Sequence, residues 1–457
     1  MSIFRSIFPA ILLCIATSLP AQTPLSLEQC LEIAVASNLQ VRQSGNSVSI
    51  EKINLIRRKF DFLPGLSSSI SGSKNFGRTV DNFTQAIAQS PVTLNMNLGA
   101  SLTIFRGFSK WNELRKAENS VKAAVYSLED LKNDVRLNVA LAFFQTIFAR
   151  DNRAIAQNNR DLLARQVKRN QELVKAGKRT EGDLYGIEAE FATAKASLVT
   201  AQNSFESARL NLLLSLDLDP RENFELVRPD LERLVLGTEV RSPEAIFDYA
   251  RQNNPAMREQ EMRLLASKFA MQSARSVYFP TLSLNYGAYS FYSSNARPLD
   301  SLRFVQGELH QFFGPTTPFN NQFSNNLSHG ISLSLNIPIF SNWAFRQTYN
   351  NAQINYDNSI LQYQSQKNEL LRDVMQAWQD ATAAQSQFSA NQEKLISLQK
   401  SYEYAEKKYE VGLLDFYTLK EILNQKIRAE LELNQAKYDY VLKRKVLDLY
   451  EGKEMRF

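Results

Sequence analysis

Few residues in this chain have side chains that could catalyse a reaction or hold a metal ion. The 457 residues include two histidines, His310 and His329, and two cysteines, Cys14 and Cys30. The motifs H-E-x-x-H, G-x-S-x-G and G-x-G-x-x-G, which mark zinc, serine-nucleophile and dinucleotide sites, do not occur in the sequence. The pair at 177–178 (GK) lacks the upstream glycine of a phosphate-binding loop. The sequence therefore predicts no enzyme, no metal site and no cofactor.

Residues 1–21 have the features of a secretory signal peptide. Arg5 gives a positive start, residues 7–13 form a short apolar core, and small residues lead up to Ala21. Cleavage after Ala21 would remove Cys14 and leave only Cys30, so the mature chain is not expected to form an internal disulfide.

Two alternatives for the leader are less favoured. A transmembrane helix is disfavoured because the apolar core is short and contains Pro9. A lipoprotein signal would need a small residue before Cys14, where Leu13 stands. Since no later segment has ~18 consecutive apolar residues, we expect an exported chain that is either soluble or inserted in a membrane as strands.

The composition favours long helices and argues against nucleic acid as a partner. Only 16 glycines and 14 prolines occur in 457 residues, and both residue types interrupt helices. The net charge of +6 comes from interspersed charges, with the densest runs at 57–59 and 443–445. Short basic runs on helices are usually solvated faces, and the chain is predicted to be exported.

The chain contains an internal duplication. Residues 26–38 (SLEQCLEIAVASN) resemble residues 242–254 (SPEAIFDYARQNN). Pro64 lies as far beyond the end of the first segment as Pro280 lies beyond the end of the second. A repeat of this size indicates a duplicated domain. The predicted divisions are a signal peptide at 1–21, a first structural repeat at 22–220, a connector at 221–241 and a second repeat at 242–457.

Each repeat is predicted to contain one long helix and two helices of half its length. The interval from Phe105 to Gly177 equals that from Phe340 to Gly412. One helix of about 70 residues would be ~100 Å long. Two shorter helices placed end to end would match that length. Apolar residues at three- and four-residue steps support coiled-coil packing. The long helices are expected at 107–176 and 341–411, and the shorter ones at 27–62, 183–216, 243–279 and 415–450.

Four segments are predicted to be strands that cross a membrane. Apolar and polar residues alternate along them, as expected for a strand with one lipid-facing and one wet face. A half-buried soluble sheet gives the same alternation. A membrane location is favoured because the polar faces carry Ser, Thr and Asn with almost no charge. The strands are expected at about 65–76, 92–105, 281–292 and 329–340, with a polar loop at 295–326 between the last two.

Aromatic residues gather where strands meet helices, as they do at membrane interfaces. Four strands cannot close a barrel, and open edges are not tolerated in lipid. Copies of the chain must therefore pool their strands: a dimer would supply eight and a trimer twelve. The predicted membrane-interface aromatics are Phe62, Phe105, Phe108, Tyr278, Phe279, Phe340 and Trp343.

The duplicated plan and the helix break at 409–415 (YEVGLLD) resemble the TolC family of outer membrane efflux proteins. The segment is similar to that family's Y-x-V-G-L tip, and residues 174–178 (VKAGK) stand at the matching site of the first repeat. The resemblance covers nearly all of the mature chain. It implies a mainly α-helical fold with membrane β-strands, in which long coiled-coil helices and four transmembrane strands per chain form a trimer with a 12-stranded barrel and an α-helical tunnel.

The resemblance also implies a function and partners. The trimer would be a passive conduit of a tripartite efflux or type I secretion system, located in the outer membrane and extending into the periplasm. Its partners would be a periplasmic adaptor (membrane fusion) protein and an inner-membrane pump of the RND or ABC type. The expected adaptor-docking residues are Ala176, Gly177, Lys178, Val411, Gly412 and Leu413. Each glycine could instead serve only as a helix break.

A periplasmic gate is the last implied site, with candidates Asp183, Tyr409, Asp415, Thr418 and Glu421. Where the family has carboxylates one turn apart, this chain has Thr418 and Glu421, which puts cation selectivity in doubt. Asp415 and Glu421 could also be residues that simply suit the first turns of a helix. A periplasmic coiled-coil adaptor and a structural envelope protein remain alternatives for the whole chain.

Overall fold

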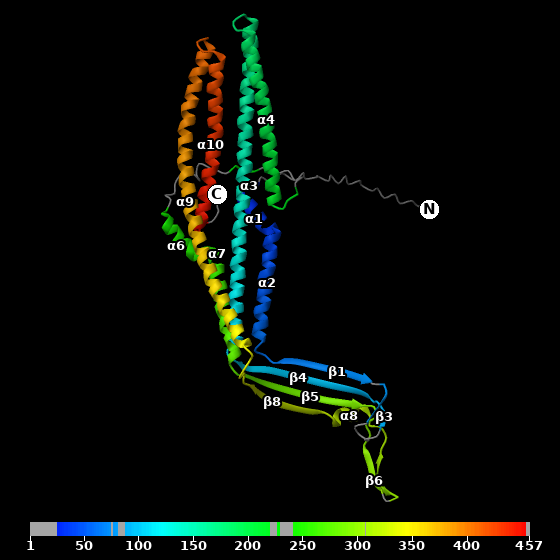
Figure 1. Cartoon of the computed structure of the whole chain (residues 1–457). Helices are drawn as coiled ribbons and strands as arrows, with labels where there is room; N and C mark the ends of the chain where they lie inside the picture. The colour runs from blue at the N-terminus through cyan, green and yellow to red at the C-terminus, as the bar shows by residue number, and fades with distance from the viewer. Residues whose placement is uncertain are drawn as a thin grey trace, which may run out of the picture. The chain divides into compact units, whose positions relative to one another are not determined.

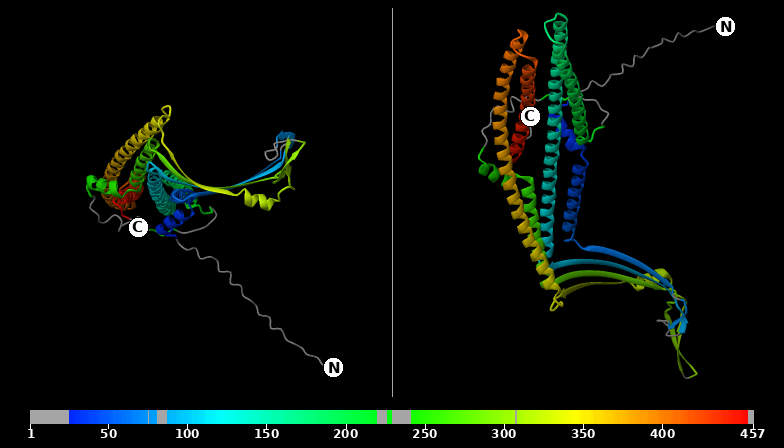
Figure 2. Two further views of the ribbon diagram at one scale, coloured as in Figure 1. Left: turned by 90° about the horizontal axis from the view of Figure 1, so that it is seen from below. Right: turned by 45° about the horizontal axis from the view of Figure 1, so that its top comes forward.

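The computed structural model describes residues 25–74, 76–80, 87–219, 226–228, 241–306 and 308–453 (Figures 1 and 2). The predicted signal peptide at 1–21 and most of the predicted connector at 221–241 lie outside these residues. No described helix has a stretch long and apolar enough to cross a membrane. The elements in chain order are α1 (Leu27–Ser37), α2 (Leu39–Phe60), β1 (Gly65–Lys74), β2 (Arg78–Val80), β3 (Ile87–Gln89), β4 (Val92–Arg106), α3 (Ser109–Lys175), α4 (Glu181–Ser215), α6 (Pro243–Asn253), α7 (Pro255–Ala274), the short 3-10 helix η1 (Arg275–Tyr278), β5 (Thr281–Ser293), β6 (Leu299–Val305), β7 (Glu308–Phe313), α8 (Phe319–Asn325), β8 (Ser328–Asn336), α9 (Ala344–Glu410) and α10 (Phe416–Tyr450).

Three pairs of corresponding helices in the two halves have equal lengths, whereas α2 and α7 have 22 and 20 residues. The long helices α3 and α9 have 67 residues each. The helices that follow them, α4 and α10, have 35 residues each, and α1 and α6 have 11 each. The long helices begin and end within three residues of the ranges 107–176 and 341–411 expected from the sequence.

The opening helix of each half is broken, whereas the sequence predicted one continuous helix at 27–62 and at 243–279. Asn38 and Asn254 have extended ψ angles of 123° and 128° and separate α1 from α2 and α6 from α7. The Asn38 side chain accepts the Val41 N–H at 3.0 Å, and Asn254 accepts that of Met257 at 3.3 Å. Asparagine is a preferred N-cap residue, so each break is a helix end followed at once by a new start.

The described residues form two compact units, and each unit contains parts of both halves of the chain. Unit 1 comprises residues up to Gly45, Ser127–Met257 and residues from Lys367 onward. Its core joins α1, α3, α4 and α10, and its fully buried side chains include Phe143, Phe144, Ile147 and Leu212. Burial of such side chains stabilises a fold by about 1.5–3 kcal/mol each, so this cluster holds the helices of unit 1 together.

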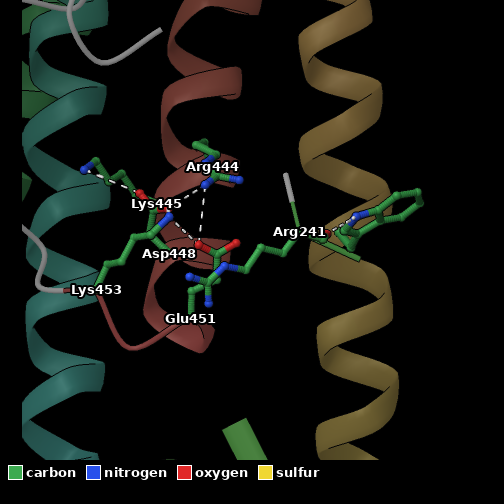
Figure 3. A network of polar contacts seen from close by, with 7 residues as sticks. Arg241, Arg444, Lys445, Asp448, Glu451 and Lys453 are labelled. Carbon is green, nitrogen blue, oxygen red and sulfur yellow. Dashed lines mark hydrogen bonds and ion pairs between the residues drawn. The ribbon is translucent and has the colours of Figure 1, made fainter. Parts of the chain in front are cut away.

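A buried network of charges fixes the end of α10 in unit 1 (Figure 3). The Arg444 guanidinium lies 3.0 Å from the Asp448 carboxylate and 3.6 Å from that of Glu451. Lys453 also pairs with Glu451. In Figure 3 the Arg241 side chain extends toward Glu451, and its backbone carbonyl accepts the Trp378 indole N–H of α9 at 3.1 Å. The hydrogen bond from Trp378 therefore ties the segment before α6 to α9.

Unit 2, comprising Asn46–Tyr126 and Arg258–Gln366, contains the strands. Four of them form an antiparallel sheet in the order β1-β4-β5-β8 (Figure 1), and the sheet is strongly curved (Figure 2). The hairpins β2-β3 and β6-β7 form two further small sheets. The four strands predicted from the sequence are thus the four strands of one sheet.

The strand register gives this sheet one apolar and one polar face, because side chains alternate along each strand and align across neighbours. A bulge between Thr103 and Phe105 brings Phe105 opposite Leu282, onto the apolar face. The apolar face includes Leu66, Ile70, Leu94, Met96, Leu98, Leu102, Leu282, Leu284, Ile331, Leu333 and Leu335. The polar face includes Ser67, Ser69, Ser71, Asn95, Asn97, Ser101, Asn285, Ser332 and Ser334.

Two strand ends and one loop differ from the sequence prediction. Strand β1 ends at Lys74 and not at 76, and β8 ends at Asn336 and not at 340. Pro338, which has no N–H to donate, lies just beyond the end of β8. The segment 295–326 is not an irregular loop, since it forms the hairpin β6-β7 and the short helix α8.

Candidate functional site

The turns that join α3 to α4 and α9 to α10 have the same backbone structure. Gly177 and Gly412 adopt left-handed φ angles of +67° and +80°. At the first turn the amides of Gly177 and Lys178 donate to the carbonyls of Val174 and Leu173, each at 2.9 Å. At the second turn the amides of Gly412 and Leu413 donate to the carbonyls of Tyr409 and Lys408 at 3.1 and 2.9 Å. This is the Schellman ending, which glycine allows because it has no Cβ.

The helix that leaves each turn is capped by a side chain. Both turns use a Thr and an Asp three residues apart, with Thr first in one turn and Asp first in the other. Thr180 accepts the backbone N–H of Asp183 at 3.2 Å. Asp415 accepts the backbone N–H and the hydroxyl of Thr418 at 2.9 and 2.7 Å. These two bonds hold the pKa of Asp415 below its ordinary value. Asp415 and Thr418, both predicted gate residues, therefore act locally as a helix cap in this structure.

The tips differ in the side chains that they expose. Val411 and Leu413 are 71% and 77% exposed, and the glycine between them has no described atom within 4 Å of where a Cβ would be. The matching positions of the first tip are Ala176 and Lys178, which are also exposed. One rigid turn thus presents two large apolar side chains, and the other presents a methyl group and a cation.

Tyr409, a predicted gate residue, is held by the other hairpin of unit 1. Its side chain is 8% exposed, and its hydroxyl donates to the Asn170 side chain at 3.0 Å. Arg179 donates to the Tyr409 backbone carbonyl at 2.9 Å and places its guanidinium 4.4 Å from the ring centroid. Burial raises the pKa of the Tyr409 hydroxyl. The positive charge of Arg179 opposes this rise, and the negative charge of Asp183 adds to it more weakly. The hairpins α3-α4 and α9-α10, which lie side by side in Figure 1, are locked together here.

Nothing in the sequence pointed to Asn170 or Arg179, although both complete this lock. Neither residue lies in a motif, and each reaches Tyr409 from the other half of the chain. An ion pair between Arg169 and Glu410, at 2.5 Å, adds to the same contact. Arg179 directly follows the first tip in the sequence, but a lone basic residue beside a turn does not indicate a contact with the other half of the chain.

Among the described contacts, the other four predicted gate residues are not brought into this lock by a hydrogen bond, and two of them, Asp415 and Thr418, form the cap of α10. Asp183 lies in the first turn of α4 and acts on Tyr409 through its charge. Glu421 accepts a hydrogen bond from Gln425, one turn along α10, at 3.0 Å. In the described part of the chain, no three His, Cys, Asp or Glu side chains gather as a metal ion would require.

Comparison with known proteins identifies the family. A family model described as "Outer membrane efflux protein" matches residues 57–216 and 246–452. This chain belongs to that family. It is 22% identical to outer membrane protein TolC of Vibrio cholerae serotype O1 over 373 residues, 80% of this chain and 78% of that protein. It is also 22% identical to TolC of Escherichia coli K12 over 429 residues, 91% and 80% of the two chains.

A solved structure shares the fold. The crystal structure of CusC superposes with a TM-score of 0.78 at 17% identity, covering 94% of this chain and 92% of that one. The predicted family and fold class are thus confirmed. The chain is an outer membrane efflux channel that extends into the periplasm. The alternatives of a periplasmic adaptor or a structural envelope protein do not agree with this family.

In an outer membrane efflux protein, the aromatic residues of unit 2 are of particular interest. Phe62 contacts Trp111 with ring centroids 5.1 Å apart, and Phe105 meets Phe108 edge to face at 5.5 Å. Tyr278 contacts two aromatics of α9. A Cβ on Gly107 would lie 2.8 Å from that of Phe279. Trp111 was not among the interface aromatics predicted from the sequence.

The remaining two predicted interface aromatics are the most exposed. Phe340 is 82% exposed and Trp343 is 64% exposed. Trp343 and Phe108 both have left-handed φ angles, of 72° and 62°, and each stands just before a long helix. The two halves thus turn from strand to helix in the same strained way and present an aromatic side chain at that point.

Proposed function

We propose that three copies of this chain form one passive conduit, with twelve strands in a closed barrel and the helices in a tunnel. Support comes from the sheet, because within the described residues its outer strands β1 and β8 each have one free edge. Unpaired backbone groups are costly in lipid, and closed barrels need about eight strands or more. A chain with four such strands therefore requires further copies. The three-fold number follows from the resemblance to the TolC family.

The exposed apolar pair at the second tip is the observation that carries the rest of the proposal. Val411 and Leu413 project from a turn whose backbone is fixed by hydrogen bonds. Apolar side chains that gather on an exposed surface mark interaction sites, and these two stand on either side of one glycine. We assign this site to a periplasmic adaptor protein that connects the channel to an inner-membrane pump of the RND or ABC type. Ala176 and Lys178 would form a second, more polar contact.

The lock at Tyr409 would then be the gate. Arg179 and Asn170 hold the second hairpin against the first, and loss of these contacts would free it to move. A tyrosine whose ring, hydroxyl and carbonyl are all engaged suits a two-state contact, because the contacts break together. Asp183 acts in this scheme through its charge, and Glu421 remains a candidate for the channel entrance.

Two measurements test the proposal. In detergent, native mass spectrometry should give the mass of three chains, and planar bilayers should show ion conduction. A monomer that stays soluble without detergent would contradict the channel. For docking, a photoreactive residue at Leu413 should cross-link to the adaptor in cells, more strongly than one at Lys178. Equal, weak labelling at both sites would contradict adaptor docking at the second tip.

A further inference from the structure

A pocket of about 560 Å³ lies in unit 2 where the first half of the chain turns from strand to helix. Its walls come from the end of α2, the start of β1, the end of β4 and the start of α3. The strand residues Gly65, Ser101 and Thr103, which line it, all belong to the polar face of the sheet. Since the interior of a membrane barrel is polar, this pocket would open to solutes in the proposed conduit and not to lipid.

The bulge in β4 places an arginine in this pocket. Along β4, the even-numbered residues from Leu94 to Leu102 lie on the apolar face. Regular alternation would place Arg106 on that face too, but the bulge shifts the alternation by one residue. Arg106 is therefore aligned with Thr281 on the polar side of the sheet, and it lines the pocket. One extra residue in the strand thus moves a cation from the apolar face to the polar one.

Three cations and two carboxylates line the pocket, and a single cation pairs with both carboxylates. Arg58 lies 3.3 Å from the Asp61 carboxylate and 3.3 Å from that of Glu113. Lys110 donates to a backbone carbonyl of β4 at 2.7 Å, a bond that leaves its charge unpaired. Arg106 is exposed and has no hydrogen bond or ion pair with any described residue. Among the described residues, the two remaining cations of the pocket therefore have no carboxylate partner.

We propose that Arg106 and Lys110 bind the carboxylate or phosphate group of an anionic solute inside the conduit. This inference rests on the proposed conduit and deepens it by assigning a charge preference to its interior. A guanidinium can hold two oxygens of such a group at once, and the ammonium keeps further donors beyond its bond to the carbonyl. Ser109 and Lys110 begin α3, so the partial positive charge of a helix amino end adds to that of the side chains.

The second half of the chain has no equivalent of this charged pocket. By the spacing of the two repeats, the positions that match the five charged residues all hold uncharged ones: Ala274, Val277, Ser341, Phe345 and Thr348. A nearby cation of the second half, Arg346, instead stacks on the Trp343 ring at 4.7 Å from its centroid. Three copies of the chain would therefore carry three such sites, and by symmetry all three would lie at one level of the conduit. A ring of arginine and lysine side chains is an arrangement by which pores favour anions.

Ion selectivity in planar bilayers tests the site. The reversal potential in a KCl gradient gives the ratio of chloride to potassium permeability. Arg106→Gln removes an exposed charge that has no described partner, so the variant should still fold and give a three-chain mass in detergent. We expect the ratio to fall by about twofold or more in Arg106→Gln, and further when Lys110→Gln is added. The control is Arg57→Gln with Lys59→Gln, which removes two exposed cations of α2 outside the pocket and should leave the ratio unchanged.

Inorganic phosphate separates anion binding from a general effect of charge. The phosphorus NMR signal of inorganic phosphate should broaden when the detergent-solubilised parent protein is added, and Arg106→Gln should remove most of that broadening. Arg106→Lys keeps the charge but lacks the planar pair of donors. It should therefore keep the chloride preference and bind phosphate more weakly than the parent.

Equal permeability ratios in the parent and Arg106→Gln, or an equal fall in the control variant, would overturn the site. A changed ratio without phosphate broadening by the parent would overturn anion binding and leave only a charge effect. A parent protein that conducts no ions would instead overturn the proposed conduit itself.

Discussion

The two helical turns of unit 1 share a backbone and differ in the side chains that they present. The position of Gly177 in the first repeat matches that of Gly412 in the second. Both turns have a left-handed glycine and the same pair of amide hydrogen bonds. The exposed neighbours of the glycine are Ala176 and Lys178 in one and Val411 and Leu413 in the other. The two repeats thus keep the same backbone conformation at the turn but differ in the side chains exposed there.

The lock between the hairpins is also one-sided. Tyr409 corresponds to Val174 of the first repeat and Arg179 to Leu414 of the second, so neither contact can be made the other way round. Arg179 reaches the Tyr409 carbonyl, but the second tip has no basic residue at the matching place. Six similar hairpins in a trimer would therefore alternate between two kinds. Such an asymmetry would reduce a six-fold ring to a three-fold one.

The sharpest way to test the difference between the tips is to remove the apolar surface of the second one. Val411→Asp combined with Leu413→Asp should lower export, measured in cells as secretion of the substrate of the pump that the channel serves, by at least tenfold. Desolvating two carboxylates in an apolar contact opposes docking, while the exposed positions leave the fold intact. Channel abundance in the outer membrane, measured by blotting, should not change.

The matched control is the same change at the first tip. Ala176→Asp with Lys178→Asp places the same two carboxylates on an equally exposed turn. We expect it to lower export less than the change at the second tip. If both pairs of substitutions lower export equally, the two tips dock in the same way despite their different side chains.

The next largest effect should come from the one-sided lock. Arg179→Ala removes a hydrogen bond worth about 0.5–1.5 kcal/mol and a cation–π contact worth about 0.5–1 kcal/mol. The closed arrangement should become about tenfold less favoured, and single-channel conductance in bilayers should rise. Lys178→Ala, which removes an exposed cation one position away, serves as control. Equal conductance of the two variants would mean that Arg179 does not hold the gate.

The architecture was readable from the sequence where a regular pattern repeats over many residues. Gly and Pro spacing located the long helices within three residues, and alternation located all four strands of the sheet. The break at Asn38 was missed because a single cap residue leaves the 3.6-residue period almost undisturbed. The break at Asn254 did have a local signal, since Pro255 follows it and begins α7. Helix α8 was missed because it covers a strand edge with two side-chain amides, a contact that has no periodic signature.

The site was less readable than the fold, for a physical reason. Each tip is formed by consecutive residues, so a glycine and its sequence neighbours are enough to predict it. The lock is a contact between distant segments, and only Tyr409 of its three residues stood in a recognisable motif. Asp415 and Thr418 were expected at the gate, yet the short range of their hydrogen bonds shows that they serve first as a cap.

A smaller effect tests whether the two turns are equivalent as backbone. Gly177→Ala and Gly412→Ala should each destabilise the local turn by about 1–2 kcal/mol, because an L-residue is strained at positive φ. Neither glycine has a described neighbour within 4 Å of a new Cβ, so strain is the main cost and should be the same at both. Amide hydrogen exchange at the starts of α4 and α10 should quicken at least fivefold.

Asparagine is the control for these substitutions, since it tolerates the left-handed conformation better than alanine. Gly177→Asn and Gly412→Asn should therefore give exchange rates closer to those of the parent protein. A clearly larger change at one turn than at the other would show that the two backbones are not equally rigid.

The smallest expected difference between the two tips is in their response to low pH. The cap of α10 is Asp415, whose pKa in the folded protein lies below the ordinary value of 3.8, whereas the cap of α4 is Thr180, which does not titrate. The stabilisation from Asp415 is present above its unfolded pKa and is lost as the pH falls through the lower, folded pKa.

Spin labels at the matched positions Lys178→Cys and Leu413→Cys, in a Cys30→Ala background, should respond differently between pH 5 and pH 2. Only the label beside Asp415 should become more mobile, and Asp415→Asn should abolish that pH dependence. Equal mobility changes at the two tips would assign the acid response to the hairpins as a whole and not to this one carboxylate.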